Sequence, residues 1–186
     1  MDTRLINFWR ILQMLELEIE SIRLKQETDQ RAIVLKTKDS DQYLVIFIGH
    51  FEVESIRLKL MNIDIERPLT HDLLVSIIEN LGASVENIII TELKNDTFYA
   101  QIIVALNGSL IKIDSRPSDA LALAVRLSVP ILVTEEVMDK AGIFIDHKND
   151  PNDKKCDAQS IDPEELESLS AFTDFIDSLD LGDIGN

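Results

Sequence analysis

The 186-residue chain is poor in cysteine and in positive charge. It holds one cysteine, Cys156, and 18 Lys and Arg residues against 34 Asp and Glu residues. A single cysteine forms no disulfide within the chain and no paired-cysteine zinc site. The net charge of −16 argues against a broad phosphate-binding surface, since such surfaces are usually basic. A small site in which acids hold metal cations remains compatible with this charge.

Several familiar signals are also absent from the sequence. No apolar run approaches the length of a membrane span, so we expect no membrane partner. The N-terminus lacks the long apolar core and cleavage site of a signal peptide, and with the lone cysteine this predicts a cytoplasmic protein. There is no Walker loop, dinucleotide-binding fingerprint or serine elbow. The common nucleotide-binding and serine-hydrolase classes are therefore disfavoured.

Hydrophobic residues make up 45% of the chain and charged residues 28%, which is typical of a globular protein. We expect an N-terminal extension (1–14), with Met14 as an alternative start, and one domain (15–145). A polar linker (146–161) and an acidic C-terminal helix and tail (162–186) follow. That last helix opens with a good capping sequence and carries an apolar stripe. It would dock on its own domain or bind a partner subunit.

The pattern in the first half of the domain predicts three strands and a helix. Apolar residues alternate over 15–24, with a slip near Ser21 that suggests a bulge, and the stretches 32–38 and 43–48 are a second and a third strand. The stretch 50–61 fits either a strand or a helix. We interpret it as a helix because the second half of the chain has one at the corresponding place.

The second half repeats this order after an extra helix. Thr70 is the expected cap of that helix, which runs to Leu81 with an apolar face and stops at Gly82. Strands, a helix, a short strand and a short helix follow at 85–93, 97–106, 110–114, 117–127, 130–133 and 135–141. A β-β-β-α unit thus occurs twice. Hairpin connections predict a largely antiparallel sheet, and the fold class is α+β.

Polar residues gather where the third strand of the second unit enters its helix: Asp114, Ser115, Arg116, Ser118 and Asp119. The helix behind them is small and aliphatic, which indicates burial. Aligning the two units places Glu52 on Asp119, each in the first turn of a helix.

Separate motifs in this chain resemble those of the bifunctional nuclease (BFN) domain family. They are Arg67-Pro-Leu-Thr-His-Asp-Leu-Leu74, Leu81-Gly-Ala, Thr97-Phe-Tyr-Ala100, and Asp114-Ser-Arg-Pro-Ser-Asp-Ala-Leu-Ala-Leu-Ala-Val-Arg126 followed by Pro130-Ile131. The resemblance covers roughly residues 15–141. It implies a compact α+β domain, commonly a homodimer, with nuclease activity on DNA and RNA in some members.

Phosphodiester cleavage needs an activated water and a stabilised anion, and metal held by carboxylates supplies both. The candidates for catalysis are His71, Asp72, Asp114 and Asp119. The candidates for binding substrate phosphate are Arg67, Thr70, Arg116 and Ser118. A divalent metal (Mg²⁺, Mn²⁺ or Ca²⁺) would be held by Asp119, Asp114 and Glu52. Each of these acids could instead serve as a helix cap or in an ion pair.

Two functions remain open from the sequence. The first is a metal-assisted nuclease that hydrolyses phosphodiester bonds in DNA, RNA or both. The alternative is a non-catalytic dimeric binding or regulatory module for a small anion or a protein partner. The acidity of the chain favours the second, and the resemblance favours the first.

Overall fold

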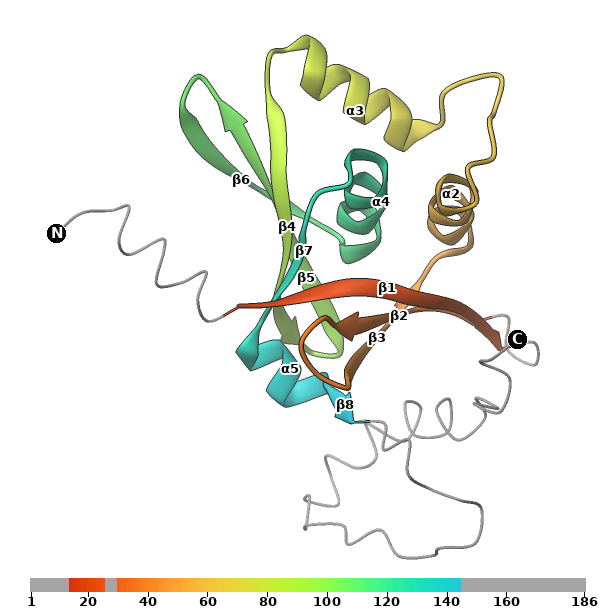
Figure 1. Ribbon diagram of the computed structural model, residues 1–186, viewed down its shortest axis with the longest axis vertical. Helices are drawn as coiled ribbons and strands as arrows, with labels where there is room; N and C mark the ends of the chain where they lie inside the picture. The colour runs from red at the N-terminus through yellow and green to blue at the C-terminus, as the bar shows by residue number, and fades with distance from the viewer. Residues whose placement is uncertain (1–13, 26–29, 145–186) are drawn as a thin grey trace, which may run out of the picture. The chain divides into compact units, whose positions relative to one another are not determined.

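The computed structural model describes residues 14–25 and 30–144. Within these residues, eight strands form one sheet in the order β6-β5-β4-β7-β1-β2-β3-β8 (Figure 1). All pairs are antiparallel except β4 with β7. The α+β class and the largely antiparallel sheet are confirmed. The N-terminal extension, the polar linker and the C-terminal helix lie outside the described residues.

The first half of the domain forms the predicted β-β-β-α unit. Its elements are β1 (Met14–Lys25), β2 (Gln30–Thr37), β3 (Gln42–Ile48) and α2 (His50–Leu60). The register of β1 against β2 shifts between Ile19 and Ser21, where the slip in alternation predicted a bulge. The helical interpretation of the ambiguous stretch is also confirmed, and Val53 and Ile56 are its buried apolar residues.

The second half repeats the unit after one additional helix. Its elements are α3 (Thr70–Asn80), β4 (Ser84–Lys94), β5 (Thr97–Leu106), β6 (Ser109–Ser115) and α4 (Pro117–Leu127). Both hairpin turns contain two residues with positive φ: Asn95 and Asp96 in one, Asn107 and Gly108 in the other. Such turns match the twist of the flanking strands. The chain therefore reverses its direction at the two hairpin turns that the sequence predicted.

A short strand joins the two halves into one sheet. β7 (Ile131–Thr134) lies between β4 and β1, parallel to the former and antiparallel to the latter. It is followed by α5 (Glu135–Ala141), as predicted, and by the two-residue strand β8 (Ile143–Phe144), which pairs with β3 and was not predicted. Since β7 bridges the halves, the hydrophobic core is continuous from β2 to β5.

The helix α4 lies at the centre of this core. Pro117 occupies its first turn, and Ser128 ends it in the left-handed conformation with φ 54°. Residues Ala120 to Leu123 are fully buried between the sheet and the helices α2 and α3. In Figure 1 these three helices lie together, so the N-terminal turns of α2 and α3 are brought toward α4. The sequence pattern predicted this burial correctly.

The extra helix α3 differs from the prediction in two ways. Thr70 is its first helical residue and not its cap; the N-cap is Leu69, whose backbone N–H donates to Asp72 Oδ2 at 2.8 Å. The apolar face predicted for the helix is also largely exposed, with Leu73 at 55%, Ile77 at 46% and Leu81 at 71%. Of the residues predicted on that face, Ile78 packs against the core, together with His71 and Val75.

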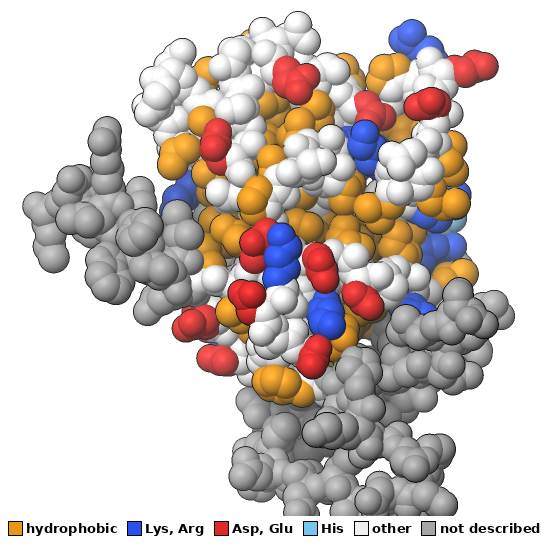
Figure 2. Space-filling model, viewed as in Figure 1, with side chains coloured by type: hydrophobic (Ala, Val, Ile, Leu, Met, Phe, Trp, Pro, Cys, Tyr) orange, Lys and Arg blue, Asp and Glu red, His pale blue; other side chains and the backbone are white. Residues whose placement is uncertain are grey.

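Apolar side chains gather across the middle of the face in Figure 2, with acidic and basic side chains below them. A groove between β1 and α4 is lined in part by Leu17, Ile19, Val125, Val129 and Pro130.

No helix within the described ranges is long and apolar enough to cross a membrane.

Candidate functional site

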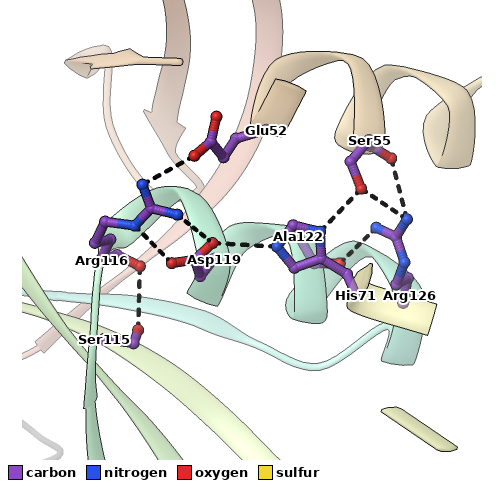
Figure 3. A network of polar contacts seen from close by, with 8 residues as sticks. All are labelled: Glu52, Ser55, His71, Ser115, Arg116, Asp119, Ala122 and Arg126. Atoms are coloured by element: carbon purple, nitrogen blue, oxygen red, sulfur yellow. Dashed lines mark hydrogen bonds and ion pairs between the residues drawn. The ribbon is translucent and has the colours of Figure 1, made fainter. Parts of the chain in front are cut away.

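The first turns of α2 and α4 meet at one arginine, Arg116. Its Nε and Nη2 donate to the two carboxylate oxygens of Asp119 at 2.8 and 3.0 Å, and its Nη1 lies 2.9 Å from Glu52 Oε1 (Figure 3). Glu52 and Asp119 are the acids that the repeat alignment placed on each other. The duplicated architecture therefore brings two equivalent acids to opposite sides of one guanidinium.

Gly49, the N-cap of α2, lies against the carboxylate of Glu52. Its φ of −69° is open to any residue, so the backbone conformation does not demand glycine. A Cβ built on Gly49 would collide with Glu52 Oε2. The absence of a side chain at position 49 thus permits Glu52 to turn back over its own helix start and reach Arg116.

His71, in the first turn of α3, joins this cluster to a second one. Its Nε2 lies 3.2 Å from Asp119 Oδ1, and its Nδ1 lies 3.0 Å from Ser55 Oγ. A carboxylate only accepts hydrogen bonds, so the proton belongs on Nε2. Ser55 Oγ accepts from Arg126 and can donate its own proton to Nδ1. Both ring nitrogens are thereby engaged by the neutral tautomer.

Arg126 anchors the far side of His71. Its side chain is 5% exposed and donates from Nε to Asp72 Oδ1 at 2.6 Å and from Nη2 to Ser55 Oγ at 2.9 Å. It also donates to the backbone oxygens of Ser55 and Ala122. A continuous polar chain therefore runs from Asp72 through Arg126, Ser55, His71 and Asp119 to Arg116 and Glu52.

This environment keeps two carboxyls ionised. Burial alone would raise the pKa of Asp119, but the hydrogen bonds from Arg116 and His71 outweigh it and hold the pKa below its ordinary value. Burial likewise opposes the charge on Asp72, while Arg126 and the Leu69 N–H lower its pKa. At neutral pH both groups are hydrogen-bond acceptors and cannot supply a proton.

The cluster opens onto a pocket of about 430 Å³. One side is polar, with Glu52, His71, Arg116 and Asp119, and Thr70 also reaches the lining. The apolar lining residues are Phe51, Leu58 and Leu69. Four of the predicted site residues thus converge with Glu52 in one place, which is of a size that small ligands use.

The remaining predicted residues lie elsewhere. Arg67 and Asp72 line a second pocket, together with Arg126, so Arg67 and Arg116, each followed by a proline, do not line the same pocket. Ser118 is buried at 6% exposure and does not line either pocket. Asp114 is exposed on β6 opposite Gln101, also outside both linings.

The three acids predicted to hold a metal do not converge as arranged here. Arg116 lies between Glu52 and Asp119, and Asp114 is absent from their pocket. Among the described residues, no group of three or more His, Cys, Asp or Glu side chains is placed to hold a metal ion. In this geometry, Glu52, Asp114 and Asp119 do not form a set of ligands around one metal ion. The requirement for Mg²⁺, Mn²⁺ or Ca²⁺ stays a prediction.

Sequence reasoning missed Ser55 and Arg126 as parts of the site. Both had a usable signal. Ser55 lies one turn after Glu52 and so shares its helix face, and Arg126 lies seven residues after Asp119, again on one face. Arg126 is also the cation of an otherwise buried helix, and a buried charge requires a partner.

Comparison with known proteins bears on this site directly. Residues 33–146 match the model of the bifunctional nuclease domain, which is more than half of the chain. The chain belongs to the bifunctional nuclease domain family. The match contains all the residues of the polar chain, from Glu52 to Arg126, so this network is built wholly within the family domain.

Relatives of two kinds were found. An uncharacterized protein of Mycobacterium tuberculosis is 36% identical over 161 residues, which cover 87% of this chain and 94% of the relative. Bifunctional nuclease 1 of Oryza sativa subsp. japonica is 35% identical over 129 residues, 67% of this chain and 39% of the plant protein. Bifunctional nuclease 2 of Arabidopsis thaliana is 30% identical over 109 residues, 56% of this chain and 33% of the relative. The alignments with the plant nucleases therefore cover a minority of those proteins.

Proposed function

We propose that the chain is a nuclease that hydrolyses phosphodiester bonds in DNA, RNA or both at the pocket around Arg116. The observation that carries this proposal is the convergence of Glu52 and Asp119 on Arg116, with His71 bonded to Asp119, in a domain of the bifunctional nuclease family. The names of the plant relatives support a nucleic-acid substrate.

Arg116 is the group we assign to the substrate phosphate. A guanidinium has five N–H donors, and the contacts with Glu52 and Asp119 use three of them. The side chain is 66% exposed, so the other two donors can reach a ligand in the pocket. One N–H remains on Nη1 and one on Nη2, and either can donate to a phosphate oxygen.

Asp119 and Glu52 have different proposed roles in the reaction. Asp119 already accepts bonds on both oxygens, from Arg116 and His71, and we assign it to holding Arg116 in place. Glu52 contacts Arg116 through Oε1, which leaves Oε2 to accept a proton from an attacking water. His71 is then a positioning residue, because its two nitrogens are bonded to Asp119 and Ser55.

The test is cleavage of labelled single-stranded DNA, duplex DNA and RNA by highly purified protein with Mg²⁺, Mn²⁺, Ca²⁺ or EDTA. Glu52→Gln should lower cleavage by at least about 100-fold, the lower range for loss of a general base. Asp119→Asn should also lower cleavage, because it weakens the bonds that hold Arg116, and both variants should stay folded by circular dichroism. Asp139→Asn, on α5 and outside the site, is the matched acid-to-amide control. Cleavage that survives in both site variants would reject this site.

Three further variants, at two residues, separate the sequence-based roles from the structural ones. Asp114→Asn tests whether β6 contributes to the reaction, since Asp114 lies outside the pocket. His71→Ala, compared with His71→Gln, tests the positioning role, because an amide can keep one of the two hydrogen bonds. A partial rescue by Gln agrees with positioning, and complete loss in both variants agrees with a direct catalytic role.

A non-catalytic module for a small anion is the second candidate function. It is favoured by the saturation of the network, in which Asp119 and His71 have no unbonded acceptor within the described contacts. This function predicts no hydrolysis with any metal, together with phosphate binding that Arg116→Gln removes. Calorimetric titration with inorganic phosphate measures it.

We also propose that the chain forms a homodimer through the exposed stripe of α3, defined by Leu73, Ile77 and Leu81. Each of these large apolar side chains is at least 46% exposed, and the stripe itself bears no charge, so two copies can meet without repulsion. Ile77→Lys should convert a dimer to a monomer in light scattering, whereas Glu79→Lys on the same helix should not. A wild-type monomer at all concentrations would refute this proposal.

A further inference from the structure

Phe51, the second residue of α2, is the most exposed large apolar side chain of the described residues, at 83%. A single exposed phenylalanine is by itself unremarkable. This one differs in position, because it lines the same pocket as Arg116, His71 and Asp119. An open aromatic ring and a partly free guanidinium thus face one cavity.

The pocket offers both kinds of contact that a nucleotide needs, apolar contacts for the base and N–H donors for the phosphate. Phe51, Leu58 and Leu69 provide apolar contacts, and Arg116 provides two N–H donors that are not used within the described contacts. His50 makes a T-shaped contact with the Phe51 ring, with centroids 5.4 Å apart and an interplanar angle of 76°. One neighbour in this geometry covers at most one face of the Phe51 ring, so at least one face stays open to a flat partner.

We propose that Phe51 stacks on an unpaired nucleobase while Arg116 binds an adjacent phosphate, so that the pocket takes single-stranded nucleic acid in preference to duplex. This inference rests on the proposed nuclease function and names its substrate class. Aromatic side chains bind bases of any sequence in this way, because every base has a π-face. A base within a duplex has both faces covered by its neighbours.

Charge leads to the same preference. The pocket lining includes three carboxylates, from Glu52, Glu54 and Asp119, against the single guanidinium of Arg116. The chain as a whole carries −16. A duplex presents a dense array of phosphates and binds best to broad basic surfaces. A short single strand can place one phosphate at Arg116 and gain its remaining affinity from stacking, which does not depend on charge.

The test measures binding separately from cleavage. Fluorescence anisotropy compares a labelled six-nucleotide thymidine oligomer, an abasic oligomer with the same phosphates, and a duplex of the same length, in EDTA and in Ca²⁺. Phe51→Ala should weaken binding of the thymidine oligomer by about 5- to 150-fold, the range that one stacked base contributes. Binding of the abasic oligomer should not change. Phe51→Trp should retain affinity, and Phe144→Ala, at a 71% exposed site on β8, is the matched control.

A second reporter uses the fact that Trp9 is the only tryptophan. In a Trp9→Phe, Phe51→Trp variant, the thymidine oligomer should quench the indole emission and the abasic oligomer should not.

The proposal is overturned if Phe51→Ala binds the thymidine oligomer as wild type does, if it loses binding of the abasic oligomer equally, or if wild type binds neither oligomer. Phe51-dependent binding without cleavage would support stacking and reject the nuclease. Cleavage that is unchanged in Phe51→Ala would support the nuclease and reject stacking by Phe51.

Discussion

The ion pair between Asp72 and Arg126 makes an asymmetric prediction about stability. The two side chains share one hydrogen bond of 2.6 Å, but Arg126 is 5% exposed and Asp72 is 38% exposed. Removing Asp72 leaves a buried guanidinium without a counter-charge, whereas removing Arg126 leaves a carboxylate that water can reach. We therefore expect Asp72→Ala to destabilise the protein more than Arg126→Met.

The expected losses in stability follow from the groups that each substitution leaves without a partner. Loss of one partner of a buried charge pair costs about 3–5 kcal/mol. In Arg126→Met, the backbone oxygens of Ser55 and Ala122 lose a bond but remain within helices, where each still accepts from the N–H four residues on. Asp72 keeps its bond from the Leu69 N–H. Four hydrogen bonds are lost, but each acceptor residue keeps another bond, so the cost should be only about 1–2 kcal/mol, the net value of one or two hydrogen bonds.

Urea unfolding of the two single variants and the double variant measures these costs. Arg126→Met added to Asp72→Ala should raise stability, because it removes the stranded charge. The midpoint of thermal unfolding should fall by roughly 10 °C in Asp72→Ala and recover in part in the double variant. A double variant less stable than Asp72→Ala, or an Arg126→Met variant with the larger cost, would refute this reasoning.

Three further predictions concern the backbone and pH. Gly49→Ala should leave the fold intact but displace the Glu52 carboxylate, and so lower nuclease activity as Glu52→Gln does; unchanged activity would show that Glu52 needs no such close approach. Gly82 has φ +75°, so Gly82→Ala should cost about 1 kcal/mol in urea unfolding although nothing lies within 4 Å of the new Cβ. Because the pKa of Asp119 is lowered in the fold, its stabilising contribution is complete above the unfolded pKa of about 3.9 and is lost as pH falls through the folded value. The stability of Asp119→Asn should accordingly fall less steeply in this acid range than that of wild type, and parallel curves would contradict the pairing.

Local patterns predicted most of the secondary structure. Alternation, turn residues and the Asn107-Gly108 signal act over a few residues, so they specify strands and hairpins wherever the rest of the chain lies. The helix at 50–61 required the repeat as an additional argument, because its own pattern was ambiguous. The cap of α3 was wrong by one residue, since the carboxylate of Asp72 and not the hydroxyl of Thr70 accepts the first free N–H.

The sequence also predicted several members of the site by residue type and place. His71, Arg116 and Asp119 are at helix starts, and the repeat alignment identified Glu52 as the counterpart of Asp119. It could not separate Asp72 from Asp119, although both are acids in first turns. The structure assigns Asp72 to the second pocket and Asp119 to the first.

Composition, periodicity and turn chemistry by themselves determined an acidic α+β domain built from a repeated β-β-β-α unit, with its central helix buried. Only the tertiary structure decided which polar groups meet, because the contacts between helices that define the site join residues 16 to 71 positions apart in the sequence. Ser55, His71 and Arg126 belong to three helices, and their contact depends on how those helices pack on one sheet. The exposure of the α3 stripe was decided in the same way, since an apolar helix face does not reveal whether its own sheet or another molecule covers it.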